Sequence, residues 1–169
     1  NWWYVYGGQV FFQATDVLPG TVGGQYGWWK VCEGKVNFDD DVCENAYGWW
    51  KITTGKVDFQ YTGLAQNACG WWMIQNGHVN FGSNGLVDNG NGWWLVRNGC
   101  VDFNYNGLVD NGNGWWLIRN GYVDFDYNGL VDNGNGWWLV KNGCVDFSYQ
   151  GYVQNECGVW WVSNGQVQF

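Results

Sequence analysis

The chain has 169 residues, of which 46% are hydrophobic, 21% are aromatic and only 13% are charged, and its formal net charge is −8. This composition is too apolar for a disordered polymer, and no apolar run approaches the ~20 residues that span a bilayer, so membrane insertion is not expected. The negative charge argues against nucleic acid and against an anionic membrane surface as partners. It permits a cationic or neutral partner, and it also favours solubility.

All 16 tryptophans lie in Trp-Trp pairs that recur about every 22 residues. The pairs are Trp2-Trp3, Trp28-Trp29, Trp49-Trp50, Trp71-Trp72, Trp93-Trp94, Trp115-Trp116, Trp137-Trp138 and Trp160-Trp161. A fixed short period indicates a repeat architecture, in which each repeat buries its apolar face against its neighbours. We therefore expect a single repeat domain over residues 1–169, whose atypical terminal repeats act as caps. Its repeats are expected at 2–27, 28–48, 49–70, 71–92, 93–114, 115–136, 137–158 and 159–169.

Each repeat is predicted to contain a β-hairpin. Two alternating segments flank a two-residue turn, and Asn-Gly in that place is the strongest short-range signal for a type I′ hairpin. In chain order the eight turns are Gly7-Gly8, Glu33-Gly34, Thr54-Gly55, Asn76-Gly77, Asn98-Gly99, Asn120-Gly121, Asn142-Gly143 and Asn164-Gly165. The predicted fold class is all-β, a solenoid of about eight stacked hairpins.

A two-residue turn fixes the register of its hairpin, so the two faces can be separated. In repeat 93–114, Val96 faces Val101 and Trp94 faces Phe103, which assigns these four side chains to the core. The Val101 and Phe103 positions never vary among the eight repeats, and the Val96 position is always Val or Ile. The second tryptophan of each pair is therefore predicted to be a core residue.

The opposite face carries the first tryptophan of each pair and the position of Leu95. That position varies from Leu to Lys, which is typical of a partly exposed site. In the last repeat the pair is shifted by one place. Trp160 takes the core position, Trp161 takes the Leu95 position, and Val159 replaces the first tryptophan.

Between the hairpins the chain reads Tyr-Asn-Gly-Leu-Val-Asp-Asn-Gly-Asn, for example over 105–113. We expect a linker that is too short for a helix and whose Leu-Val step anchors one repeat to the next. The Asp-Asn-Gly-Asn-Gly segments that start at Asp88, Asp110 and Asp132 lack the alternating acidic residues and the bidentate Glu of calcium loops. Turn chemistry is therefore the favoured interpretation.

Neither a metal, a cofactor nor catalysis is expected. The single histidine, His78, and cysteines without any CxxC pair lack the usual spacing of a zinc site. No nucleophile–base pair or paired carboxylate stands out from the repeat pattern. Disulfides in an extracellular protein are favoured instead, with the pairing left open. The candidate cysteines are Cys32, Cys43, Cys69, Cys100, Cys144 and Cys157.

The pattern Gly-Trp-Trp…Asn-Gly-x-Val-Asp-Phe-x-Tyr-x-Gly-Leu resembles the cell-wall-binding and choline-binding repeats of Gram-positive, notably clostridial, surface proteins and lysins. The resemblance covers the chain from Trp2 to Phe169, although those families usually carry Trp-Tyr-Tyr where this chain has Val-Asp-Phe. It implies a solenoid of hairpins and a secreted, non-catalytic module of the cell wall, which attaches a larger protein to a glycan or a teichoic acid. Because the chain opens directly on a Trp pair, we expect it to be a processed piece of something longer.

The first tryptophans are the candidate ligand-binding residues. An exposed indole beside a tyrosine and a carboxylate can stack on a sugar ring or hold a choline-like cation. The aromatic candidates are Trp28, Trp49, Trp71, Trp93, Trp115, Trp137, Tyr61, Tyr105, Tyr127 and Tyr149, with polar support from Asp58, Asp102, Asp124 and Asp146. The competing interpretation is that these indoles pack against the next hairpin.

Two functions stay open: a multivalent binding module, or a structural spacer or fibre-forming segment without a small ligand. Self-association through the repeats also stays open.

Overall fold

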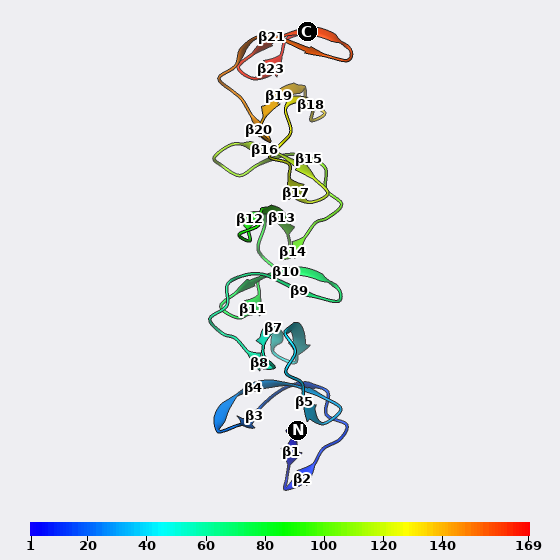
Figure 1. Cartoon of the computed structure of the whole chain (residues 1–169), viewed down its shortest axis with the longest axis vertical. Coiled ribbons are helices and arrows are strands. Elements are labelled where there is room, and N and C mark those ends of the chain that lie inside the picture. Colours follow the sequence, from blue (N-terminus) through cyan, green and yellow to red (C-terminus); the bar gives the residue numbers. More distant parts are fainter. The chain divides into compact units, whose positions relative to one another are not determined.

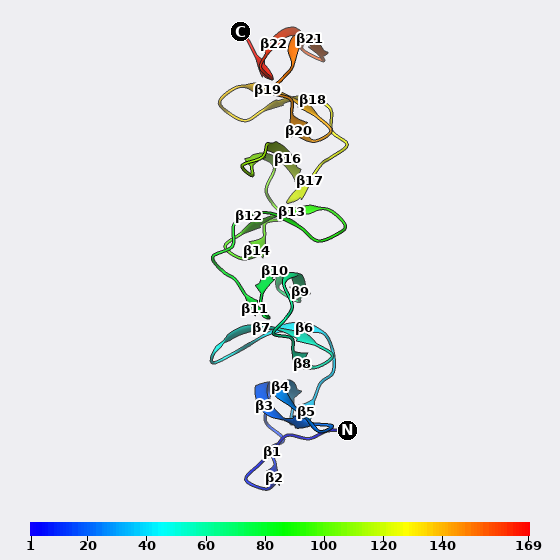
Figure 2. The same ribbon diagram turned by 90° about the vertical axis from the view of Figure 1, so that its left-hand side faces the viewer.

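The computed structural model describes all residues from 1 to 169, and it consists of short strands, turns and irregular connections. It has no helix long and apolar enough to cross a membrane. The chain forms two compact parts: an N-terminal part of residues 1–84 and 97–101, and a C-terminal part of residues 85–96 and 102–169. Within each part, Figures 1 and 2 show successive hairpins that follow one another in chain order.

Three kinds of strand alternate along the chain. The tryptophan strands, named for the Trp pairs that they carry from the second repeat onward, are β1 (Val5–Tyr6), β4 (Gln25–Cys32), β7 (Gly48–Thr53), β10 (Gly70–Gln75), β13 (Trp93–Arg97), β16 (Trp115–Arg119), β19 (Trp137–Lys141) and β22 (Gly158–Ser163). The return strands, which follow the two-residue turns, are β2 (Gln9–Val10), β5 (Lys35–Val36), β8 (Lys56–Val57), β11 (His78–Val79), β14 (Cys100–Val101), β17 (Tyr122–Val123), β20 (Cys144–Val145) and β23 (Gln166–Val167). The incoming strands, which precede the tryptophan strands, are β3 (Asp16–Val22), β6 (Asp41–Asn45), β9 (Gly63–Asn67), β12 (Gly85–Asp88), β15 (Gly107–Asp110), β18 (Gly129–Asp132) and β21 (Gln150–Asn155).

The predicted two-residue turns are confirmed. In seven of them the first residue is not glycine and has φ between 47° and 50°, the left-handed conformation that a type I′ turn requires. The predicted register also holds, because Ile118 pairs with Val123 and Arg119 pairs with Tyr122 across β16 and β17. The return strands end after these two pairs, and the chain then turns away.

The Gly-Leu-Val-Asp part of the segment predicted to be a linker is a strand, so that part of the prediction is wrong. In the C-terminal part, β15 pairs with β16 through Leu108 opposite Leu117 and Val109 opposite Trp116. The Asp-Asn-Gly-Asn-Gly segment forms the loop between these two strands, closed by a 3.1 Å hydrogen bond from Asn111 N to Gly114 O. Each tryptophan strand from β4 onward thus has an incoming strand on one edge and a return strand on the other.

Backbone hydrogen bonds join consecutive repeats within each part. In the C-terminal part, Leu117 N donates to Gly143 O at 2.8 Å, and Gly143 N donates to Tyr127 O at 3.0 Å. The N-terminal part repeats the pattern, since Lys51 N donates to Gly77 O at 2.7 Å. The turn of one repeat is therefore docked against the preceding repeat, as expected for a solenoid.

Two aliphatic positions form the interior. The Val96 position is 0% exposed in six repeats, and the valine at the Val101 position is at most 7% exposed in six. The Leu95 position was predicted to be partly exposed, but Leu95, Leu117 and Leu139 are only 3–4% exposed, so that prediction is wrong. Leu117 is buried because it packs against Val140 and Val145 of the following repeat and faces the incoming strand that the sequence did not reveal.

The phenylalanine at the Phe103 position was predicted to be a core residue, and this too is wrong. Phe59, Phe81, Phe103 and Phe147 are 40–50% exposed. Since the return strand ends at its valine, the phenylalanine two residues later lies in the turn that follows. It reaches the second tryptophan of its own repeat edge-on, as Phe125 does with Trp116 at 5.7 Å between ring centroids.

Candidate aromatic binding site

Rings from two consecutive repeats meet in clusters of three. The first tryptophan of one repeat packs against the second tryptophan and the phenylalanine of the next. In the C-terminal part, the centroids of Trp115 and Trp138 are 5.0 Å apart, and each lies 5.7 Å from the centroid of Phe147. The corresponding clusters are Trp93/Trp116/Phe125 in the same part and Trp49/Trp72/Phe81 in the N-terminal part.

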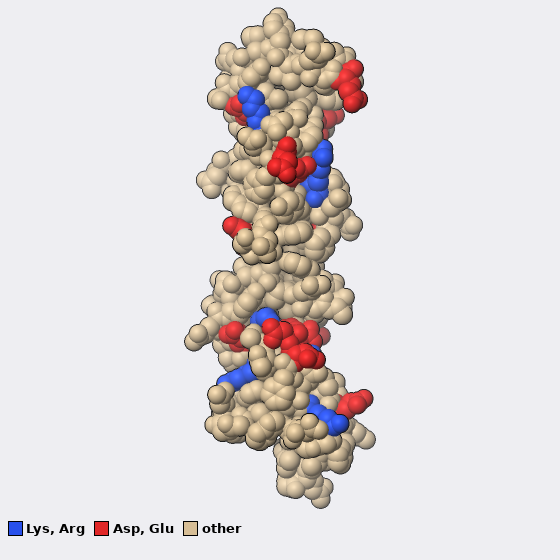
Figure 3. Space-filling model, viewed as in Figure 1, with Lys and Arg blue, Asp and Glu red and all other residues tan.

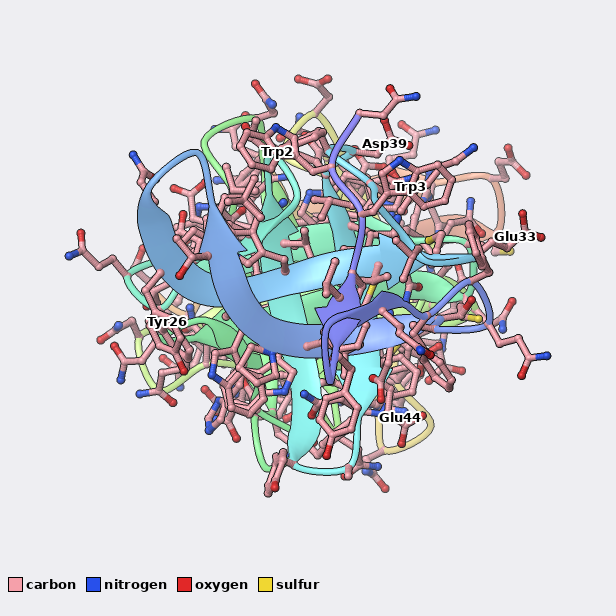
Figure 4. All side chains as sticks on the ribbon, turned by 90° about the horizontal axis from the view of Figure 1, so that it is seen from below. Trp2, Trp3, Tyr26, Glu33, Asp39 and Glu44 are labelled. Carbon is pink, nitrogen blue, oxygen red and sulfur yellow. The ribbon has the colours of Figure 1, made fainter.

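Both tryptophans of a pair are half-buried in most repeats. Among the second tryptophans only Trp29 is fully buried, at 7% exposure, whereas Trp2 and Trp3 at the chain start are 49% and 39% exposed. Figure 4 labels Trp2 and Trp3 at the periphery of the N-terminal part. The prediction that the second tryptophan is a core residue and the first an outer one therefore holds only in part. The first tryptophan of one repeat stacks on the second tryptophan of the next, so both are half-buried at the repeat junction.

One of these ring clusters lines a pocket that is open to solvent. A cavity of about 240 Å³ lies among Trp137, Trp160 and Phe169, with Cys157 and Val167 completing its wall. These residues occupy the same repeat positions as the closed clusters. The cavity is apolar, since four of the five lining side chains are aromatic or aliphatic.

The shift of the last Trp pair is confirmed. Trp160 Nε1 donates to Asn155 Oδ1 at 2.9 Å, as Trp72 Nε1 does to Asn67 Oδ1, which places Trp160 in the second-tryptophan position. Trp161 instead pairs with Tyr152 across β21 and β22 and is 42% exposed. The 61% exposed Val159 stands in the first-tryptophan position.

From the second repeat onward, the residue after the two-residue turn lies against the second tryptophan of the preceding repeat, a contact that the sequence analysis did not predict. In the N-terminal part, Lys35 Nζ lies 4.9 Å from the ring centroid of Trp3, and Lys56 Nζ lies 5.6 Å from that of Trp29. Ammonium groups at such distances interact favourably with the indole face. The only sequence signal was the variability of this position.

The predicted tyrosines and aspartates make intramolecular hydrogen bonds. Tyr61 OH donates to Leu64 O at 2.6 Å, and Tyr127 OH donates to Leu130 O at 3.1 Å. An aspartate Oδ1 accepts the amide N–H two residues further on, as Asp124 does from Asp126 at 3.3 Å. Tyr105 and Tyr149 bond in the same way as the first two tyrosines, and Asp58, Asp102 and Asp146 in the same way as Asp124.

Basic side chains lie over these tyrosines. The guanidinium carbon of Arg119 is 4.6 Å from the ring centroid of Tyr127, and Arg119 also pairs with Asp124 at 3.3 Å. Lys141 makes the equivalent contacts with Tyr149 at 4.3 Å and Asp146 at 3.0 Å. This arrangement of a base, an acid and a tyrosine thus recurs in two consecutive repeats.

On the N-terminal part, Figure 3 shows acidic groups beside basic ones. Lys30 Nζ lies 2.6 Å from Asp41 Oδ2, and both groups are partly buried. Burial alone would raise the pKa of Asp41, but hydrogen bonds from Lys30, from Val42 N and from the Cys43 thiol lower it below its ordinary value. Burial is likewise outweighed at Lys30, whose pKa is raised by Asp41.

All six cysteines are free thiols, so the predicted disulfides are not formed. Cys43 is packed against Val17 and Ile52, and burial raises the pKa of its thiol to about 12. Burial also raises the pKa of Cys144. Both side chains therefore behave as small apolar residues rather than as reactive thiolates.

The stacked hairpins make this an all-β repeat protein, and its aromatic clusters lie at the boundaries between repeats. The family model of the choline-binding repeat matches four consecutive segments, at residues 60–80, 82–102, 104–124 and 126–146. Each match spans one incoming, one tryptophan and one return strand. The chain belongs to the choline-binding repeat family.

The chain is also similar to several solved structures, with TM-scores below 0.5. CbpJ from Streptococcus pneumoniae matches with 16% identity and a TM-score of 0.37 over 85% of this chain and 50% of that protein. Choline binding protein F from Streptococcus pneumoniae matches with 20% identity and a TM-score of 0.38 over 92% and 49%. A complex of CbpF with ipratropium gives the same identity and TM-score, over 92% and 50%. The chain thus spans about half the length of these proteins. No curated protein sequence matches it.

Proposed function

We propose that the chain is a non-catalytic module that attaches a larger protein to the cell wall by binding choline-type quaternary ammonium groups of a surface polymer. The observation that carries this proposal is the open pocket among Trp137, Trp160 and Phe169. Its composition and its size of about 240 Å³ suit a trimethylammonium group. Family membership supports the same ligand class.

The chemistry of such a pocket favours a cation that cannot donate hydrogen bonds. A quaternary ammonium group has no N–H to satisfy, so it enters an apolar site at low desolvation cost. Aromatic faces attract it electrostatically, at about 0.5–2 kcal/mol for each ring depending on desolvation. The formal net charge of −8 further favours a cationic partner over an anionic one.

The first tryptophans Trp28, Trp49, Trp71, Trp93, Trp115 and Trp137 are proposed as ligand-contacting residues. In the pocket at Trp137 the indole forms one wall. In the closed clusters, ligand entry requires that the first tryptophan separate from the second tryptophan of the next repeat. Tyr105 and Asp102 are also proposed to support the ligand, as are their equivalents in other repeats. They would do so through atoms that are not engaged in intramolecular hydrogen bonds.

Repetition of weak sites compensates for their low individual affinity. When several ligand groups belong to one polymer, each further binding event becomes intramolecular and proceeds at a high effective concentration. A cell-wall glycan or teichoic acid that carries choline-type groups at intervals is such a polymer. We therefore propose an extracellular or cell-wall location for the module.

A structural spacer is the second candidate function, and the closed clusters favour it. In Trp115/Trp138/Phe147 the two indoles already fill the space between them, with centroids 5.0 Å apart. If every junction stayed closed, the tryptophans and phenylalanines at the repeat junctions would only stabilise the packing of neighbouring repeats.

Tryptophan fluorescence during titration with choline distinguishes the two functions. The binding proposal predicts a saturable change that Phe169→Ala and Trp137→Ala weaken. Trp161→Ala is the matched control, because this partly exposed indole belongs to the same repeat and lies outside the pocket. A saturable change that all three variants reduce equally would place the ligand elsewhere. If neither choline nor cell-wall polysaccharide changes the fluorescence, the binding proposal is wrong and the structural spacer is the remaining candidate function.

A further inference from the structure

Asn-Gly steps occur four times in each of the repeats 71–92, 93–114 and 115–136. Four consecutive steps are Asn106-Gly107, Asn111-Gly112, Asn113-Gly114 and Asn120-Gly121. Such steps are chemically labile, because a glycine without a side chain lets its backbone nitrogen approach the preceding asparagine carboxamide. Whether the reaction occurs depends on how firmly the structure holds these two groups.

Two of the four steps have their glycine nitrogen engaged. Gly121 is buried in its turn, and its N–H donates to Tyr105 O at 3.1 Å. Gly112 N donates to Asp110 Oδ1 at 2.8 Å. A nitrogen held in this way by another acceptor is not directed at its own asparagine side chain.

A third step has its carboxamide fixed. Asn106 Oδ1 accepts a hydrogen bond from Asn120 N at 3.0 Å, and its Nδ2 donates to Asn104 O at 3.1 Å. Rotation of this side chain toward Gly107 N would break both bonds, and the fold therefore opposes the reaction there.

The fourth step has neither restraint. The side chain of Asn113 is exposed and makes no hydrogen bond, and Gly114 N has no protein acceptor. Asn135 and Gly136 are in the same state one repeat later. Asn91-Gly92 occupies the equivalent place in the preceding repeat.

We propose that Asn91, Asn113 and Asn135 are sites of selective spontaneous deamidation. The nitrogen of the following glycine attacks the asparagine Cγ, so that a new C–N bond closes a succinimide ring. The Cγ–Nδ2 bond breaks, and the amide proton leaves with the departing ammonia. Water then opens the ring at either carbonyl and gives aspartate or isoaspartate, with no oxidant or reductant involved.

The products add up to three negative charges to a chain whose net charge is already −8. Each charge arises in the loop directly before a Trp pair, at Trp93, Trp115 and Trp137. The modification thus makes successive repeats more acidic with age, independently of what the module binds.

Peptide mapping by mass spectrometry after incubation of the whole chain at mildly alkaline pH tests the proposal. We expect Asp and isoAsp to accumulate at Asn91, Asn113 and Asn135 several-fold faster than at the other Asn-Gly steps, and this selectivity to disappear in urea. Conversion of Asn120 and Asn142 as fast as that of Asn113 in the folded chain would overturn the proposal.

The variant Asp110→Ala tests the physical cause. It frees Gly112 N, so conversion at Asn111 is expected to rise several-fold but to stay below the rate at Asn113, because Asn111 Oδ1 still accepts a 3.0 Å hydrogen bond from Asn113 N. Asn133 is the internal control, because Gly134 N keeps its 2.8 Å bond to Asp132 Oδ1. An unchanged rate at Asn111, with Asn133 also unchanged, would show that hydrogen bonding of the glycine nitrogen does not set the selectivity.

Discussion

At the scale of single residues, the burial of a repeat position can be predicted from the sequence only when the residues that contact it can be predicted as well. The Val96 and Val101 positions were predicted correctly because they are paired across a turn whose geometry the sequence specifies. The exposure of the Leu95 position was misjudged because the residue there varies from lysine to leucine. Lys51, at 8% exposure, explains this variation, since its aliphatic stem is buried while its Nζ reaches Ile52 O at 2.6 Å.

The ion pair between Lys30 and Asp41 is expected to make the stability of the N-terminal part depend on pH. The pKa of Asp41 is lowered by folding, so its contribution is present above its unfolded pKa of about 3.9 and is lost as the pH falls through the folded pKa. Asp41→Asn is predicted to lower the free energy of unfolding at neutral pH by about 1–3 kcal/mol. Denaturant melts of wild type and variant should converge in acid.

Asp39→Asn is the matched control for that measurement. Asp39 is exposed, and it is a neighbour of Asp41 in the same acidic run. Equal losses for Asp39→Asn and Asp41→Asn would show that the net charge, rather than the pair with Lys30, controls the effect.

At the scale of elements, turns were predictable and the incoming strands were not. Asn-Gly specifies the left-handed turn residue by local chemistry alone. The Gly-Leu-Val-Asp segment of β15 is four residues long and shows no alternation clear enough to indicate a strand. Its pairing with β16 is decided by packing of Leu108 and Val109, which a single sequence does not display.

Two glycines near one hairpin are predicted to differ in their tolerance of alanine. A Cβ at Gly121 would lie 2.5 Å from Asp102 O and 2.9 Å from Phe103 Cα, whereas a Cβ at Gly112 would meet nothing within 4 Å. Both have positive φ, which costs alanine roughly 1–2 kcal/mol. Gly121→Ala should cost roughly 1–3 kcal/mol more, because the turn must move away from the backbone that it contacts. Equal melting midpoints would contradict this docking.

Stacking of tryptophans across a repeat junction predicts coupling between mutations. Trp115→Ala and Trp138→Ala should each destabilise the C-terminal part, and the double variant should be less damaging than their sum by roughly 0.5–1.5 kcal/mol. The coupling is measured by a double-mutant cycle from denaturant melts. Strict additivity would show that the 5.0 Å contact contributes nothing beyond burial.

At the scale of the whole molecule, each part follows the logic of a repeat protein, in which the core lies between neighbours. The cluster of Leu117, Val140 and Val145 combines side chains of two consecutive repeats. The period of the Trp pairs was sufficient to predict this architecture. The candidate site was predicted only in part: the sequence identified the first tryptophans, but the second tryptophan and the phenylalanine of the next repeat become their neighbours only through the stacking of hairpins.

We propose that the pocket among Trp137, Trp160 and Phe169 recognises a quaternary ammonium group by its charge and its shape together. Isothermal titration calorimetry with choline and with its neutral isostere 3,3-dimethylbutan-1-ol tests this most directly, since the two ligands differ only in the charged centre. We predict saturable binding of choline that is at least several-fold tighter than binding of the isostere and is lost in Phe169→Ala. Equal binding of the two ligands, or no binding of either, would contradict the claim.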